Sequence, residues 1–170
     1  MKNSTKFLIF ALIVLAVTVV DQASKYLVVS SIALNSGFEL VPGYLDIVHV
    51  RNKGAAFGLL SQSTWAFRST LFLVVSLVAL IVILRLLAVT EAPDWYLLGG
   101  YSLFFGGALG NLIDRLRFDE VIDFLDVHIG NLHWPAFNVA DSALCVGAVL
   151  FFVHFVRAGR RVGRDSGSAP

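Results

Sequence analysis

Residues 69–89 read STLFLVVSLVALIVILRLLAV, an almost unbroken apolar run in which Arg85 is the single charged side chain. An α-helix needs about 20 mostly apolar residues to cross the hydrocarbon core of a bilayer. Three further stretches meet that requirement, at about 7–29, 95–113 and 136–156. The sequence therefore predicts a membrane protein built on four spanning helices.

The composition of the whole chain agrees with this prediction. Of the 170 residues, 57% are hydrophobic and 15% are charged, and the mean hydropathy is +0.78. Soluble domains carry roughly 45–50% apolar and about 25% charged residues. The net charge is only +1, without a basic stripe, so a nucleic-acid partner is not expected. Cys145, the single cysteine, excludes a disulfide framework and is interpreted as a packing residue.

Basic residues suggest an orientation, since cytoplasmic loops of membrane proteins are enriched in Lys and Arg. Lys2 and Lys6 precede the first span, which lacks a small-x-small cleavage site and is interpreted as retained. Four arginines follow the last span: Arg157, Arg160, Arg161 and Arg164. Both termini are therefore expected in the cytoplasm. Residues 1–157 are expected to form one membrane-embedded domain, followed by a flexible polar tail at 158–170.

The two segments expected on the outer side, 30–68 and 114–135, are not simple linkers. Residues 38–50 and 121–129 are rich in β-branched and aromatic side chains, and Pro42-Gly43 interrupts the first of them, which predicts short strands at the membrane surface. These segments also contain basic residues on the side where they are unexpected: Arg51, Lys53, Arg68, Arg115 and Arg117. Such residues suggest a role beyond topology.

Ionisable groups inside a span cost about 2.5–3.5 kcal/mol each on insertion scales, so they mark candidate functional residues. Asp21 and Lys25 are four residues apart and share a helix face, as a structural ion pair or as a support for a nearby site. The run 106–115, GGALGNLIDR, places Gly106 and Gly110 for close helix packing. It ends with three polar groups, which face one way or form a solvated helix end: Asn111, Asp114 and Arg115. Arg115 is suited to orient an acceptor bidentately.

Two further carboxylates point to acid–base chemistry. Asp123 lies in the apolar segment VIDFL at 121–125, and Asp141 follows Asn138 at the start of the fourth span. Capping accounts for Asn138 and Asp141, but it does not account for Asp123. Two acids in a partly dry site share one proton, so that one acts as base and the other as hydrogen-bond donor. No His-Glu-x-x-His motif is present, so a metal site is not expected.

The segment RNKGAAFG at 51–58 is interpreted either as a surface turn or as a substrate-contacting loop, in which Gly54 and Gly58 permit close backbone approach. Together with DQASK at 21–25, GALGNLIDR at 107–115, VIDF at 121–124 and FNVADS at 137–142, it resembles the motifs of the lipoprotein signal peptidase (signal peptidase II) family, in order, over about residues 15–155.

This resemblance implies an all-α membrane protein of four helices with a small extracytoplasmic β-cradle and an amphipathic surface segment. It implies an aspartyl endopeptidase of the bacterial inner membrane that cuts diacylglyceryl-modified prolipoproteins just before the lipidated cysteine. Asp123 and Asp141 would be the catalytic pair, with the site near the outer face. Asp114 is a rival to Asp123 for the first role, but Arg115 beside it and Asn111 one turn away favour a supporting role for Asp114. Supporting or substrate-binding residues would be Asp21, Lys25, Asn52, Gly54, Asn111, Asp114, Arg115, Asn138 and Ala140.

By the same resemblance, no metal or organic cofactor is needed, globomycin-type inhibitors bind, membrane lipid surrounds the enzyme and the chain acts as a monomer. Two other classes of function fit the acids. In a proton-coupled transporter they would form a relay, although a relay should extend across the whole membrane. In an assembly factor they would only hold helices together.

Overall fold

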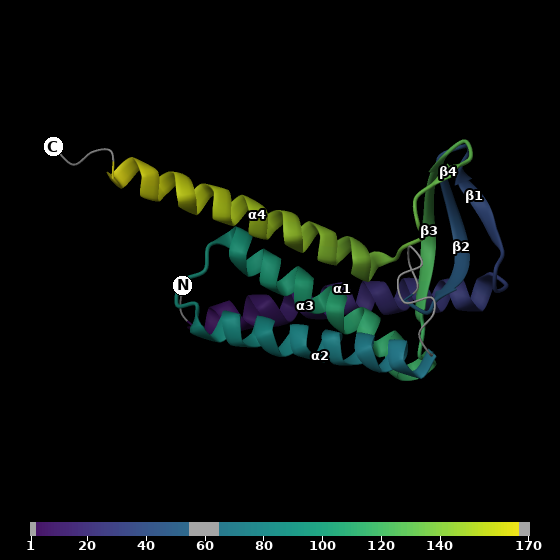
Figure 1. The fold of residues 1–170 in the computed structure, drawn as a ribbon, viewed down its shortest axis with the longest axis horizontal. Helices are drawn as coiled ribbons and strands as arrows, with labels where there is room; N and C mark the ends of the chain where they lie inside the picture. Colours follow the sequence, from purple (N-terminus) through teal and green to yellow (C-terminus); the bar gives the residue numbers. More distant parts are fainter. Residues whose placement is uncertain (1–2, 55–64, 167–170) are drawn as a thin grey trace.

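Four long helices form the body of the protein (Figure 1). The computed structural model describes residues 3–54 and 65–166. The helices are α1 (Asn3–Ser31), α2 (Trp65–Val89), α3 (Trp95–Phe118) and α4 (Val139–Ser166). Each contains a segment long and apolar enough to cross a membrane, so the predicted four spans are confirmed.

Two helix ends differ from those expected. α3 continues five residues past 113 and ends at Phe118. The next residue, Asp119, caps it: it has a left-handed φ of 58° and donates its N–H to the carbonyl of Arg115. Basic residues in this last turn interact favourably with the negative end of the helix dipole. α4 begins at Val139 and remains helical to Ser166, well beyond the expected end of the span. Arginine is a good helix former, so the polar residues after 157 extend the helix up to that point.

Helix α3 is the centre of the bundle. In its apolar window 56% of the residues are buried, against 17–22% in the other three helices. Glycines allow this central position: a Cβ on Gly106 would lie 2.9 Å from Cβ of Val17 in α1, and one on Gly107 would lie 2.4 Å from the carbonyl oxygen of Ala140 in α4. The close packing expected at this run is confirmed.

The start of α1 and the end of α4 lie at the same end of the bundle (Figure 1). A buried lysine connects two helices at the start of α1. Lys6 is 1% exposed, and its Nζ donates to the carbonyl oxygens of Leu87 and Thr90 at 2.8 Å each. These carbonyls at the end of α2 have no partner within the helix, so the ammonium group caps it. Lys6 therefore joins α1 to α2 at this end.

A four-stranded antiparallel sheet lies across the opposite end of the bundle (Figure 1). Its strands are β1 (Gly37–Val41), β2 (Leu45–Asn52), β3 (Val121–Ile129) and β4 (Leu132–His133), in that spatial order. The predicted strands and the break at Pro42-Gly43 are thus confirmed. β2 and β3 are far apart in sequence, and their pairing places Val50 opposite Asp123. The amphipathic surface segment stays a prediction.

Candidate active site

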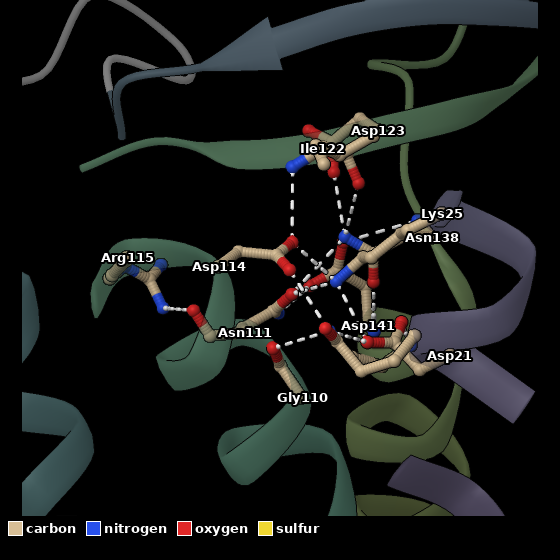
Figure 2. A network of polar contacts seen from close by, with 12 residues as sticks. Asp21, Lys25, Gly110, Asn111, Asp114, Arg115, Ile122, Asp123, Asn138 and Asp141 are labelled. Carbon is tan, nitrogen blue, oxygen red and sulfur yellow. Dashed lines mark hydrogen bonds and ion pairs between the residues drawn. The ribbon is translucent and has the colours of Figure 1, made fainter. Parts of the chain in front are cut away.

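A buried polar cluster lies where α1, α3 and α4 meet strand β3 (Figure 2). Its members are at most 5% exposed although most of them are charged: Asp21, Lys25, Asn111, Asp114, Asp123 and Asn138. Burying a charge is costly unless it is paired and hydrogen-bonded. The contacts of each group therefore decide what the cluster can do.

Lys25 is the cation at the base of the cluster. Its Nζ lies 2.9 Å from Oδ2 of Asp21 and 2.7 Å from Oδ2 of Asp114, and it donates to Oδ1 of Asn111 at 3.0 Å. An ammonium group has three hydrogens, so these three acceptors satisfy it completely. The predicted Asp21–Lys25 pair is confirmed, and Asp114 is the second carboxylate of the same ion-pair group.

Gln22 is a member of the cluster that the sequence analysis did not identify. Its Nε2 donates to Oδ1 of Asp114 at 2.9 Å, and to Oδ2 of Asp21 and the carbonyl oxygen of Gly110 at 3.2 Å each. The signal for it was present, since an amide directly beside an acid inside a span needs partners of its own. Gln22 fixes the carboxylates that Lys25 neutralises.

Both of these carboxylates also accept backbone N–H groups from other elements. Oδ1 of Asp21 accepts from the N–H of Ala140, in the first turn of α4, at 2.9 Å. Oδ2 of Asp114 accepts from the N–H of Ile122 in β3 at 3.2 Å. Asp21 therefore holds the start of α4, where a negative charge is favoured by the helix dipole. Asp114 holds the start of β3.

Asp123 differs from these two acids because amides surround it. Its Oδ1 accepts from Nδ2 of Asn138 at 2.8 Å and its Oδ2 accepts from Nδ2 of Asn52 at 2.9 Å. It forms no ion pair among the described residues, whereas Asp21 and Asp114 both pair with Lys25. Asp123 is thus a buried carboxyl group without a cation of its own.

Asp141 lies in the first turn of α4 and is partly exposed. Its N–H donates to Oδ1 of Asn138 at 2.9 Å, and its Oδ2 accepts from the N–H of Asn138 at 3.3 Å. This reciprocal arrangement is a capping box, as expected from the spacing. Its other oxygen, Oδ1, accepts from Nδ2 of Asn111 at 2.8 Å. Asn138 thus contacts both Asp123 and Asp141.

The chain between β3 and α4 fixes the position of Asn138. Phe137 pairs with Leu125 of β3 in an isolated antiparallel bridge, with N–H to carbonyl distances of 2.8 and 3.0 Å. Trp134 N–H likewise donates to the carbonyl of Val127 at 2.8 Å. The chain therefore runs back along β3 after the turn, so that Asn138 arrives beside Asp123.

The surroundings of Asp123 favour its protonated form. Burial is the main cause, and together with the negative charge of Asp141 it raises the pKa of Asp123 to about 7. The hydrogen bonds from Asn52 and Asn138 and the charge of Lys25 act in the opposite direction. Near neutral pH this carboxyl group can either release or accept a proton.

Arg115 lies near the acids, but among the described residues it does not form the bidentate contact that was expected. Its guanidinium donates to the carbonyl oxygen of Asn111 at 3.3 Å and to Oγ of Ser76 at 3.5 Å, and it lies 5.5 Å from the ring centre of Phe72. It therefore turns from α3 toward α2. Its positive charge lies beside the cluster and interacts electrostatically with the acids there.

Gly54 continues the site beyond the end of β2. Its N–H donates to Oδ1 of Asn52 at 2.8 Å, which orients the amide that contacts Asp123. Its φ of +75° favours glycine, and a Cβ there would overlap the ring of Phe72. The rest of the predicted loop, residues 55–58, lies outside the described residues.

The fold and this cluster define a class of protein: a multi-pass membrane protein with a buried polar cluster in which one asparagine contacts two acids of different elements. Within residues 3–54 and 65–166, no group of three or more His, Cys, Asp or Glu side chains is arranged to hold a metal ion. Most of the site residues predicted from the sequence lie together in Figure 2. Asn52 and Ala140 contact the cluster by hydrogen bonds, and Gly54 is connected to it through Asn52.

Comparison with known proteins identifies the family. Residues 13–157 match the family model described as Signal peptidase (SPase) II. A lipoprotein signal peptidase of Oleidesulfovibrio alaskensis is 47% identical over 87% of this chain and 93% of its own length. One from Syntrophotalea carbinolica is 47% identical over 92% and 96%. A solved bacterial membrane enzyme is 34% identical, with a TM-score of 0.77 over 87% of each chain.

The chain belongs to the signal peptidase II family, the peptidases that process bacterial prolipoproteins. It is a hydrolase and a multi-pass protein of a bacterial membrane.

Proposed function

We propose that this peptidase is an aspartic endopeptidase in which Asp123 and Asp141 form the catalytic pair. The observation that carries the proposal is the shared asparagine. The side chain of Asn138 donates to Oδ1 of Asp123 at 2.8 Å and its N–H donates to Oδ2 of Asp141 at 3.3 Å, so one residue contacts the carboxyl groups of two different elements. Asp114, the rival candidate, is instead neutralised by Lys25 at 2.7 Å.

The reaction needs one proton shared between the two acids. The ionised carboxylate removes a proton from a water molecule, whose oxygen attacks the carbon of the scissile carbonyl. The protonated carboxyl group donates a hydrogen bond to the carbonyl oxygen as it becomes negative. When the tetrahedral intermediate collapses, the C–N bond breaks and the leaving amine receives a proton from the pair. The raised pKa of Asp123 suits it to carry the shared proton at the start.

The other polar residues position this pair. Asn52 and Asn138 each hold one oxygen of Asp123 by a hydrogen bond and so fix its orientation, while burial keeps its pKa raised. Asn111 orients Asp141 through its Nδ2 and is itself held by Lys25. Asp21 fixes the start of α4 through Ala140. These residues act through their neighbours, so we assign them positioning roles.

The substrate class follows from the family resemblance. We infer that the enzyme cuts diacylglyceryl-modified prolipoproteins just before the lipidated cysteine, with the sheet end on the outer side of the inner membrane and both termini in the cytoplasm. A site at the end of the spans suits a substrate whose acyl chains remain in the bilayer. We further infer a monomeric enzyme that is inhibited by globomycin-type compounds.

The test is cleavage of a diacylglyceryl-modified prolipoprotein by purified wild type, Asp123→Asn and Asp141→Asn. The matched control is Asp126→Asn, which changes an acid three residues further along β3 that pairs with His133 instead. We expect both site variants to stay folded and to lose cleavage by at least about 10²–10⁴-fold, while Asp126→Asn cuts normally. Full cleavage by either site variant would reject the proposed pair.

A further inference from the structure

Basic side chains at the sheet end of the bundle are left without a role by the catalytic proposal. Arg51 and Lys53 lie at the end of β2, where both approach Glu120, at 3.9 and 3.3 Å. Arg117 lies in the last turn of α3, is exposed, and forms no ion pair among the described residues. Bacterial membrane proteins usually concentrate such residues on the cytoplasmic side, so their presence here needs another explanation.

Two of these side chains meet at one aromatic ring. The guanidinium of Arg117 lies 4.9 Å from the ring centre of Phe118, and that of Arg51 lies 5.7 Å from the same centre. Phe118 thus brings a cation from α3 and a cation from β2 to one place. Guanidinium groups frequently bind phosphate oxygens in bidentate geometry, so either of these two could contact a phosphate.

A cavity of about 200 Å³ opens beside Arg117, between α1 and α3. Its walls are mainly apolar or aromatic, formed by Tyr26, Val29, Phe118 and Ile122. Lys25 and Asp114 also line it, on the side of the polar cluster. We call this space the α1–α3 cavity; it combines an apolar wall with a cation.

The depth of the cavity matches the headgroup region of a bilayer. The 24 residues of α3 rise about 36 Å, whereas the hydrocarbon core is about 30 Å thick. With Trp95 at one membrane surface, Arg117 lies at the headgroup level of the other. Tyr26, on the neighbouring helix, is 71% exposed, as expected for an interfacial aromatic residue.

We propose that the α1–α3 cavity binds an anionic phospholipid of the surrounding membrane. Its phosphate contacts the guanidinium groups of Arg117 and Arg51, and one acyl chain lies along Tyr26, Val29 and Phe118. Charge complementarity favours an anionic headgroup, and the apolar wall favours a chain-bearing ligand over free phosphate. The inference is independent of the roles of Asp123 and Asp141.

Such a lipid would contact the cluster from the side of Lys25 and Asp114. A ligand that binds only the folded state stabilises it. Bound phospholipid is therefore expected to raise the unfolding temperature of the protein in detergent, and an anionic headgroup is expected to do so at lower concentration than a zwitterionic one.

The experiment uses phosphatidylglycerol with a photoreactive group on one acyl chain, added to the delipidated full-length protein in detergent. Labelled residues are located by mass spectrometry, and unlabelled phosphatidylglycerol, phosphatidylcholine or glycerol phosphate compete. The variants are Arg117→Gln and the double variant Arg51→Gln/Arg117→Gln. The matched control is Arg157→Gln, an exposed arginine 5.0 Å from the ring centre of Tyr96 at the opposite end.

We expect labelling around residues 26–29 and 118–122, with phosphatidylglycerol competing better than phosphatidylcholine. Loss of one guanidinium should weaken the lipid about fivefold at this position, and loss of both should weaken it further. Arg157→Gln should leave the labelling unchanged. The proposal is overturned by equal labelling in the double variant, by equal competition from phosphatidylcholine, or by glycerol phosphate competing as well as the lipid. Thermal unfolding of each variant verifies that it is folded.

Discussion

Nδ2 of Asn138 donates to Oδ1 of Asp123 at 2.8 Å, joining the residue before α4 to a carboxyl group of β3. The same side chain also caps α4, because its Oδ1 accepts from the N–H of Asp141. One asparagine therefore has two separable tasks: the amide nitrogen positions an acid, and the amide oxygen stabilises a helix.

Replacing Asn138 by serine should separate these tasks. A serine hydroxyl still caps the helix but cannot reach Asp123 as a donor, so Asn138→Ser is expected to lower kcat about 100-fold while it keeps the cap of α4. Asn138→Ala loses both tasks and should also cost about 1 kcal/mol in the free energy of unfolding. Cleavage assays and thermal unfolding of both variants measure the two effects. Equal activities of Asn138→Ser and wild type would show that the amide donor is unimportant.

The raised pKa of Asp123 predicts how stability changes with pH. The folded state holds this proton up to about pH 7, whereas an unfolded aspartate releases it near pH 3.9. The contribution of Asp123 to stability is therefore greatest below pH 4 and is lost as the pH rises to about 7, on the order of 4 kcal/mol in total. Asp123→Asn should remove this loss and unfold at a higher temperature than wild type at pH 8. An unchanged difference between the two proteins from pH 4 to 8 would contradict the prediction.

The same group predicts the pH dependence of cleavage. Activity needs one proton on the pair, so kcat/KM should fall as the pH rises above about 7. Cleavage of the prolipoprotein between pH 5 and 9 tests this, with Asp126→Asn as a control that should keep the wild-type profile. A profile that stays level through pH 8 would argue against a shared proton.

Removing the cation of the cluster should destabilise the protein more than removing a surface charge does. Lys25→Met leaves Asp21 and Asp114 buried without a cation, which costs about 3–5 kcal/mol. Arg51→Gln breaks an exposed pair with Glu120 and should cost less than about 1 kcal/mol. Thermal unfolding in the same detergent compares the two. Similar unfolding temperatures would show that Lys25 is not needed to neutralise the acids.

The packing of α1 against α3 at Gly110 should also be sensitive to substitution. A Cβ there would lie 2.5 Å from Oδ2 of Asp21, so Gly110→Ala must separate α1 from α3 and is expected to reduce both stability and cleavage. Gly159→Ala, in α4, has open space around the new methyl group and should be neutral or slightly stabilising. Unfolding temperatures and cleavage rates of the two variants provide the comparison. A fully active, stable Gly110→Ala would contradict the observed packing.

The sequence predicted those features that depend on local pattern. Spans follow from apolar length, strands from β-branched runs around Pro42-Gly43, and the Asp21–Lys25 pair from helical spacing. Asp123 was identifiable because an acid in an apolar segment needs partners.

Other features depend on tertiary contacts and could not be predicted in this way. Arg115 turns toward Phe72 of α2, a neighbour that helix periodicity does not reveal. The place of Gln22 beside an acid indicates that it needs partners, but that these are Gly110 and Asp114 follows only from the packing of α3 against α1. The double role of Asn138 could be predicted only by someone who knew that β3 passes beside the start of α4.

The paired segment after β3 determines which changes in chain length the enzyme can tolerate. The bridge between Leu125 and Phe137 fixes how many residues lie between it and Asn138, whereas Gly130 lies at the far turn with open space around it. A residue inserted at that turn would enlarge a loop and leave the two acids in place. One inserted between Phe137 and Asn138 would shift α4 against the sheet. Lengthening the chain by a single residue would therefore abolish or spare catalysis according to the side of this bridge on which it falls.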